Sequence, residues 1–418
     1  MKIQTLVLMG MLISAKLTAA PVEQAVLNHY ADLALTMYQD ALLEARDLDR
    51  AVKALISHPD EAHLEAARKA WISARHPYQQ TEAYRFGNPI VDEWEGKVNA
   101  WPLDEGLIDY VADSYGKVSD ENPYYTANII ANPTLTQGNH LIDTRQLDKT
   151  TLSKQLHELG DVESNVATGY HAIEFLLWGQ DLNGNGPGAG NRPASDYDTQ
   201  NCTGGHCERR GAYLNAVTEL LIDDLQWMVD QWQEHGAARV AVTEGDSQRN
   251  LAAIFTGLGS LSYGELAGER MKLGLLLHDP EEEHDCFSDN THWSHYNDAL
   301  GILNVYTGRY IRTNGEIVTG PSLSSLVKNR NPESDHLLRV RMEETLFHMN
   351  RLVDSAEQGV AYDQLIGENN PDGNALVANA VEALVKQTRA IEQAVQVMGL
   401  ESIAFEGSDS LDDPEKVR

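Results

Sequence analysis

Apolar residues recur every three to four positions through most of this chain, which is the period of an amphipathic α-helix. One such stretch begins at residue 21 and stops at His58-Pro59, and the next, 60–86, ends at Gly87-Asn88-Pro89. Gly and Pro mark the ends of these stretches, as expected of helix stop signals. Because strand signals are scarce, the sequence predicts an all-α fold.

The helical pattern is interrupted by two irregular zones, residues 87–140 and 181–205, which are rich in Gly, Pro, Asn and aromatic residues. Long loops of this kind in a compact protein are often functional. We expect two helical-bundle halves packed together, with long irregular loops. The expected boundaries are a signal peptide at 1–20, an N-terminal bundle at 22–180, an irregular loop at 181–207, a C-terminal bundle at 208–405 and an acidic tail at 406–418.

Composition and the first residues limit the environment and the partners. Hydrophobic residues make up 42 % of the 418, and the formal net charge is −31. Such a charge argues against nucleic acid as a partner, because phosphates would be repelled. Lys2, a short apolar run and the small residues Ala19 and Ala20 are typical of a secretory signal. We expect an exported protein, periplasmic or associated with the outer membrane.

The three cysteines fit an oxidising compartment. Cys202 and Cys207 flank a Gly-Gly pair in NCTGGHCERR, which allows the tight turn of a local disulfide. A metal site that includes His206 is the alternative. Cys286 is left over, and it could be free or could pair with either of the other two.

The stretch GYHAIEFLLWGQD places His171 and Glu174 three residues apart inside an apolar run. On a helix both side chains project from one face. Metal ligation and a hydrogen-bonded pair inside a core explain this spacing about equally well. Phe175 stands where the inverse zincin motif H-x-x-E-H needs its second His, so this helix alone cannot supply a zinc ligand set.

A second polar group lies in HPYQQTEAYRFGNP, where Tyr78, Glu82 and Arg85 fall on one helical face. A structural Glu–Arg pair, worth little if it is exposed, is the alternative to a binding role. Arg85 also precedes a helix end, where it could satisfy terminal carbonyls.

A third group lies in LSYGELAGERMKLG, with Glu265 and Glu269 four residues apart and Arg270 beside them. On an α-helix the two carboxylates share a face. Gly264 and Gly268 have the same spacing and would allow another helix to approach closely, which explains these glycines as well as a site does.

In DNTHWSHYNDALGILNVY, His292, His295 and Asp298 follow each other at intervals of three. His295 and Asp298 thus repeat the spacing of the first pair. This face could bind a metal or take part in catalysis. Exposed histidines near the start of a helix are the alternative.

A calcium loop is suggested by DLNGNG, in which Asp181, Asn183, Asn185 and Gly186 occupy the first, third, fifth and sixth places of the motif. The twelfth place holds Arg192 instead of the bidentate Glu. We therefore do not expect calcium in this loop.

These segments together resemble the imelysin family. GYHAIEFLLWG resembles its G-x-H-x-x-E signature through Gly169, His171 and Glu174, and four other long segments resemble iron-regulated imelysin-like proteins: QTEAYRFGNPIVDEWEGKVNAWPLDEGLIDYV, DLNGNGPGAGNRP, NCTGGHCERR and THWSHYNDALGILNVYTG. The resemblance implies an all-α fold of two bundle-like halves, a pocket between them that contains the signature His and Glu, export, and a relation to iron uptake.

Three functions follow as hypotheses. The first is an exported protein that binds a metal, iron before zinc, for iron acquisition or homeostasis, with an iron-uptake membrane component as partner. Its expected metal ligands are His171, Glu174, Glu82, Glu265, Glu269 and His295, and its pocket residues are Arg85, Arg270, Tyr78, His292 and Asp298. The second is an imelysin-type metallopeptidase, although no complete zincin helix is present. The third is a module that binds a small ligand without metal.

Overall fold

The structure is a computed structural model that describes residues 22–138, 140–400 and 403–417. The predicted signal peptide, 1–20, lies outside these residues. Helices contain 66 % of the residues and strands 3 %, so the predicted all-α fold is confirmed. The seven longest helices are α1 (Val22–Ser57), α2 (Glu61–Gln80), α7 (Cys207–Trp232), α9 (Ser247–Ser260), α11 (Thr291–Thr307), α13 (Pro332–Glu357) and α15 (Pro371–Met398).

Shorter elements connect these helices. The shorter α-helices are α3 (Pro89–Asn99), α4 (Glu105–Ile108), α5 (Lys149–Thr151), α6 (Gly169–Trp178), α8 (Ala237–Thr243), α10 (Leu273–Leu277), α12 (Leu323–Arg330), α14 (Tyr362–Ile366) and α16 (Asp409–Asp412). A 3₁₀ turn, η1 (Thr81–Tyr84), continues α2, and a π-helix, η5 (Leu261–Lys272), continues α9. Two antiparallel hairpins pair β1 (Thr134–Gln137) with β2 (His140–Asp143) and β3 (Arg309–Ile311) with β4 (Ile317–Thr319).

The helix ends follow from local signals in the sequence. The first helix ends at Ser57, before Pro59, and Asp60 caps α2 by accepting a hydrogen bond from the His63 amide. Pro332 and Pro371 occupy the first turns of α13 and α15, where a missing N–H costs nothing.

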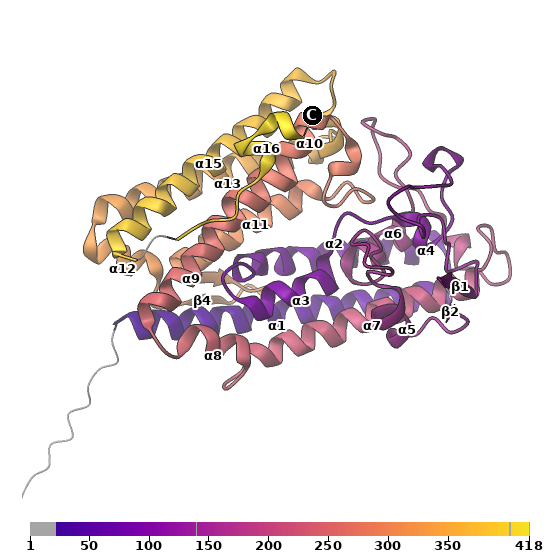
Figure 1. Cartoon of the computed structure of the whole chain (residues 1–418), viewed down its shortest axis with the longest axis horizontal. Coiled ribbons are helices and arrows are strands. Elements are labelled where there is room, and N and C mark those ends of the chain that lie inside the picture. The colour runs from indigo at the N-terminus through magenta and orange to yellow at the C-terminus, as the bar shows by residue number, and fades with distance from the viewer. Residues whose placement is uncertain (1–21, 139, 401–402, 418) are drawn as a thin grey trace, which may run out of the picture.

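The larger hydrophobic core includes the buried face of α1, which runs side by side with α7 (Figure 1) and also packs on α2. Trp71 on α2 donates a hydrogen bond from its ring N–H to the Tyr170 carbonyl on α6, at 2.9 Å. Although α7 follows the 181–207 loop, it shares this core with α1. The sequence could not show this, because apolar periodicity indicates which face of a helix is buried but not which helix covers that face.

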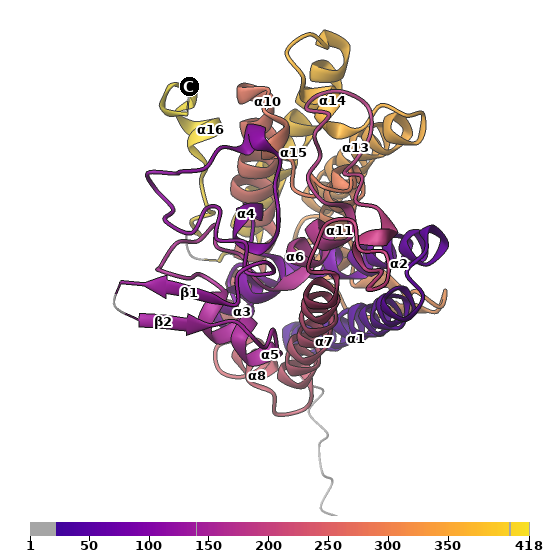
Figure 2. The same cartoon turned by 90° about the vertical axis from the view of Figure 1, so that its right-hand side faces the viewer.

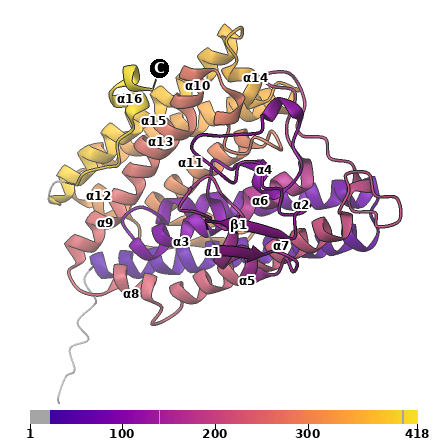
Figure 3. The ribbon, with the colours of Figure 1, turned by 45° about the vertical axis from the view of Figure 1, so that its right-hand side comes forward.

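A smaller core lies between η5, α13, α14 and α15. The helix α11 joins the two cores, because it packs on α2 on one side and on α13 on the other (Figure 3). Ile302 and Tyr306 belong to the larger core, whereas Ala299 belongs to the smaller one. Polar groups on α11 therefore face the region where the two cores meet.

The C-terminal segment, within the expected acidic tail, packs against η5. A Cβ added at Gly264 would lie 2.7 Å from the Glu406 carbonyl oxygen, and one at Gly268 would lie 2.3 Å from the Ser408 Cβ. Close approach of another helix was one of two explanations for these glycines, and the structure instead places this extended segment against them. Ser410 fastens it by donating to the Gly268 carbonyl at 2.9 Å. Within the described residues, no helix has the length and apolar character needed to cross a membrane.

Candidate metal centre

The signature pair lies on α6, a helix whose ten residues are all buried. Figure 2 places this helix near the centre of the molecule. Its first residue, Gly169, has φ +80°, and a Cβ there would lie 2.4 Å from the Val98 carbonyl oxygen. Only glycine fits this close approach, so Gly169 lets α6 enter the core in the orientation that buries His171 and Glu174.

Within α6, His171 and Glu174 form a hydrogen-bonded pair, with His171 Nδ1 3.0 Å from Glu174 Oε2. The other carboxylate oxygen of Glu174 accepts hydrogen bonds from the backbone N–H and the hydroxyl of Ser288, at 3.0 and 2.7 Å. Both Glu174 oxygens are therefore engaged. The second ring nitrogen of His171, Nε2, is buried and has no hydrogen-bond partner among the described residues.

The loop before α11 brings two more donors to His171. One ligand atom each from His171, His284 and Asp285 lie within 4.8 Å of one another, and all three residues are buried. The rings of His171 and His284 meet edge to face, with centroids 4.9 Å apart. We call these three residues the His-His-Asp group.

Arg75 on α2 holds Asp285 in place. Its guanidinium donates to Asp285 Oδ1 at 2.7 Å and to Asn99 Oδ1 at 2.6 Å. Asn290 donates to the other Asp285 oxygen at 2.8 Å, and Ser294 donates to it as well. A buried charge is stable only when it is paired and hydrogen-bonded, and Asp285 meets both conditions.

Burial sets the protonation of the group. It lowers the pKa of His171 to about 3, and the Arg75 guanidinium adds to this effect. Burial also lowers the pKa of His284 well below its usual value. Burial alone would raise the pKa of Asp285, but the Arg75 guanidinium holds this pKa at about 2. Near neutral pH the imidazoles are neutral and Asp285 is charged, which are the forms that bind metals.

A second polar cluster surrounds Arg270 on η5, which we call the Arg270 cluster. Arg270 forms ion pairs with Glu82 at 3.0 Å, Glu265 at 2.7 Å and Asp298 at 3.0 Å. It is close enough to His171 to contribute to the lowered pKa of that residue. The structure thus brings the Arg270 cluster next to the His-His-Asp group, where α2, α6, α11 and η5 meet.

Two other residues expected in the pocket, Tyr78 and Arg85, contact the carboxylates of this cluster. Tyr78 donates from its hydroxyl to Glu82 at 2.9 Å. Arg85 donates to Glu265 at 3.3 Å and pairs with Asp92 at 3.0 Å, on the more exposed side.

Glu269 is exposed and lies outside the cluster. The expectation that Glu265 and Glu269 share a face was wrong because residues Leu261–Lys272 form a π-helix. A π-helix bonds residue i to i+5, so each turn takes more residues than in an α-helix. The partner of Glu265 is therefore Arg270, five positions later.

His295 is fully buried, and neither ring nitrogen has a partner among the described residues. Its ring meets Tyr362 edge to face at 4.9 Å. His292 is partly exposed and lies near Trp293. Although His295 and Asp298 have the spacing of His171 and Glu174, no hydrogen bond joins them in the described structure, because Asp298 turns to Arg270. Neither histidine belongs to the His-His-Asp group.

Sequence reasoning missed four residues of this site: Arg75, His284, Asp285 and Ser288. The segment EEEHDCFSDNTH, 281–292, did contain a signal, because it concentrates acidic residues and histidines within a few positions. No periodicity marked it, since the residues that matter lie in a loop between η6 (Pro280–Glu282) and α11.

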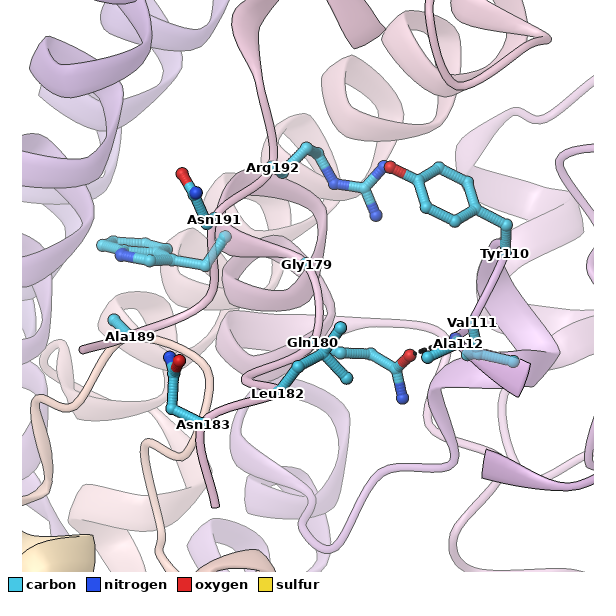
Figure 4. Close-up of a pocket in the computed structure, with 11 residues that line it drawn as sticks. Tyr110, Val111, Ala112, Gly179, Gln180, Leu182, Asn183, Ala189, Asn191 and Arg192 are labelled. Carbon is cyan, nitrogen blue, oxygen red and sulfur yellow. Dashed lines mark hydrogen bonds between the residues drawn. The ribbon is translucent and has the colours of Figure 1, made fainter. Parts of the chain in front are cut away.

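The irregular loop contains features that are separate from the His-His-Asp group. Cys202 and Cys207 are joined by a disulfide in the structure, and Cys286 is free. Arg192, at the twelfth place of the calcium-like loop, pairs with Asp109 at 2.7 Å and with Asp196 at 3.0 Å. A cavity of about 400 Å³ lies beyond the end of α6 (Figure 4), and its lining includes Tyr110, Gln180, Asn183 and Arg192 but none of the expected metal ligands.

Comparison with known proteins gives consistent matches. The sequence profile of the imelysin family, Peptidase M75, matches residues 34–391. Iron-regulated protein A of Synechococcus elongatus is 29 % identical over 149 residues, which cover 34 % of this chain and 41 % of that protein. The alignment thus spans less than half of this relative. A crystal structure from Parabacteroides distasonis, provisionally named an iron-regulated protein A precursor, has a TM-score of 0.64 and 19 % identity, covering 91 % of this chain and 97 % of that one.

Proposed function

This chain belongs to the imelysin family, and from that membership we propose that it is an exported protein that binds iron for acquisition or homeostasis. The proposed binding residues are His171, His284 and Asp285. The names of the Synechococcus and Parabacteroides proteins, both iron-regulated protein A, support the relation to iron.

The single observation that carries the proposal is the state of His171. Glu174 fixes the ring through Nδ1, while the buried Nε2 has no partner among the described residues. A buried nitrogen without a partner costs free energy unless a ligand satisfies it. Metal-binding histidines characteristically present one nitrogen to the metal and hold a carboxylate with the other. His171 has this arrangement, with His284 and Asp285 within reach.

The donor types favour ferrous iron. Two imidazoles and one carboxylate form the ligand set typical of non-haem iron(II), whereas structural zinc sites more often use thiolates. The one free thiol, Cys286, has its pKa raised well above the usual value by burial, so it is held as the weakly ligating thiol. Glu174 was expected to be a ligand. We now propose that it positions His171, because it holds the Nδ1 of that ring and does not belong to the His-His-Asp group.

The surrounding residues prepare the site for a cation. Arg75 balances the charge of Asp285 before metal arrives and fixes the carboxylate by hydrogen bonds. Burial excludes water, so a cation held here interacts strongly with the charged oxygen. The Arg270 cluster closes the adjacent side of the site with its own paired charges, and we propose that its carboxylates are structural.

Export forms part of the proposal. The precursor status of the Parabacteroides protein supports secretion, and the composition of residues 1–20 agrees with a signal peptide. We propose a periplasmic location, with an iron-uptake component of the membrane as the partner.

The proposal is tested by anaerobic calorimetric titration of the untagged protein with ferrous iron, and by parallel titrations with ferric and zinc ions. We expect one ferrous site, lost in His171→Ala and weakened about 10- to 100-fold in Glu174→Gln, which disturbs only the orientation of the ligand. Glu269→Gln, which changes an exposed carboxylate, should bind as the wild type does. Circular dichroism should show the same helix content in all four proteins.

Two results would replace this proposal. If the wild type binds no iron more tightly than about millimolar, the iron proposal fails and a metal-free ligand module takes its place. If the wild type cleaves unfolded peptides, a chelator stops this cleavage and His171→Ala lacks it, the metallopeptidase becomes the function.

A further inference from the structure

A second group of acidic side chains lies outside the His-His-Asp group. Glu283 and Asp289, at the two ends of the loop before α11, meet Asp363 on α14. One carboxylate oxygen from each lies within 4.8 Å of the other two. The loop and α14 are about 75 residues apart in the sequence, so only the tertiary fold brings these charges together.

Within this group, the carboxylate of Asp363 is buried without a hydrogen-bond partner in the part of the chain that the structure describes. The residue is 1 % exposed, and neither of its carboxylate oxygens has a hydrogen-bond partner among the described residues. Asp289 Oδ1 is in the same state. The one hydrogen bond that links the members joins the Asp363 backbone N–H to a Glu283 oxygen, at 3.1 Å.

Among the described residues, this group differs from the Arg270 cluster in having no cationic side chain paired with its carboxylates. There, three carboxylates surround one guanidinium. In the described structure, no Lys, Arg or His forms an ion pair with Glu283, Asp289 or Asp363. Burying one unpaired carboxylate is already costly, and three close together also repel one another. A cation between the oxygens would remove this repulsion.

The neighbouring charges agree with this geometry. Burial, and then the carboxylates of Asp363 and Asp181, raise the pKa of Asp289 to about 7. Burial raises the pKa of Asp363 to about 6, with Asp181 adding to the effect. The loop that begins at Asp181 lies against α14, because the Asn185 side-chain amide donates to the Asp363 carbonyl at 2.8 Å. Asp181 is therefore a fourth carboxylate close enough to act on both residues.

We propose that Glu283, Asp289 and Asp363 bind a calcium ion, with Asp181 at the edge of the site. All donors are carboxylate oxygens, which suit hard cations, and none is a nitrogen or sulfur. Calcium accepts six to eight oxygens in irregular geometry, as loops from separate segments provide, whereas magnesium requires a near-ideal octahedron. This site differs from the calcium-like motif at 181–192, because its main ligands come from two other segments.

The position of the ion gives it a structural role. Glu283 and Asp289 bracket the loop that carries His284, Asp285 and Ser288. An ion that ties both ends of this loop to α14 holds the loop in the conformation that presents these residues to α6. Calcium binding would thus stabilise the folded protein whether or not iron is bound.

The test uses the full-length mature protein, stripped of metal with EDTA, dialysed and titrated with CaCl₂ by calorimetry. Wild type should bind one calcium ion, and the melting temperature should rise with calcium concentration. Asp363→Asn and Asp289→Asn, which keep the side-chain shape, should each weaken calcium binding at least tenfold. His171→Ala is the matched control, and it should bind calcium as the wild type does.

Distinct results overturn this proposal. Wild type that gives neither heat nor a shift of melting temperature with calcium refutes it, and so does binding that survives both Asn variants. Tighter binding of MgCl₂ than of CaCl₂ refutes the choice of ion. If His171→Ala abolishes calcium binding, the ion occupies the His-His-Asp group instead. Failure of iron binding in the variants of α6 leaves all of these measurements unaffected.

Discussion

Arg75 and Asp285, which are 210 positions apart in the sequence, form an ion pair at 2.7 Å with both side chains fully buried. The pair joins α2 to the loop that carries His284, so it fixes one side of the His-His-Asp group. Arg75 also lies over the Tyr170 ring, 5.1 Å from its centroid, which favours a cation at this position.

Replacing Arg75 with Met leaves Asp285 buried without a cation, and we expect the free energy of unfolding to fall by about 3–5 kcal/mol. Urea denaturation measures this change. The matched control is Arg50→Met, which removes an exposed pair with Asp47 and should cost at most about 1 kcal/mol. Equal losses for the two variants would contradict the role of Arg75.

Because residues 261–272 form a π-helix, we expect substitutions of Glu265 and Glu269 to have different effects on the free energy of unfolding. Glu265→Gln removes the charge that two arginines contact, and should lower the free energy of unfolding by roughly 1–3 kcal/mol. Glu269→Gln changes an exposed side chain and should leave it within about 0.5 kcal/mol of wild type. An α-helical register would give similar losses for both variants, so chemical denaturation of the two distinguishes the registers.

Stability should decrease in acid because of His295. Burial, and then Arg270, lower the pKa of this residue to about 3 in the folded state, whereas Asp285 opposes the shift and His292 adds to it. The unfolded chain binds the proton near pH 6.5. The contribution of His295 is therefore complete above pH 6.5 and is lost as the pH falls from 6.5 towards 3.

His295→Phe retains a ring beside Tyr362 but cannot be protonated. Between pH 6.5 and 4 its free energy of unfolding should fall less steeply than that of wild type, by up to about 1.4 kcal/mol per pH unit. The exposed His58→Phe is the control and should follow the wild-type slope. Parallel slopes for His295→Phe and wild type would show that His295 takes up no proton on unfolding in this range.

The disulfide between Cys202 and Cys207 closes a short loop next to the start of α7. Cys202→Ser should lower the free energy of unfolding by roughly 2 kcal/mol, the value that chain entropy gives for a loop of this size. A nonreduced digest analysed by mass spectrometry should contain the linked peptide. Alkylation of Cys202 before any reduction would show that the bridge is not formed in solution.

The sequence predicted the features that depend on neighbours along the chain. It predicted the helix end before Pro59, the shared face of Tyr78 and Glu82, and the pairing of His171 with Glu174, which all depend on residues a few positions apart. Helical geometry alone places residues three or four apart on one face. The same geometry failed for Glu269, because a π-helix cannot be distinguished from an α-helix by residue spacing.

The tertiary structure alone decided which distant groups meet. The sequence could place His295 and Asp298 on one face, but Asp298 pairs with Arg270, which is supplied by a different element. His284 and Asp285 became candidate ligands because Arg75 and Ser288 tie their loop to α2 and α6. A buried charge takes whichever opposite charge the packing of the helices brings within reach, and apolar periodicity shows that a face is buried without showing what covers it.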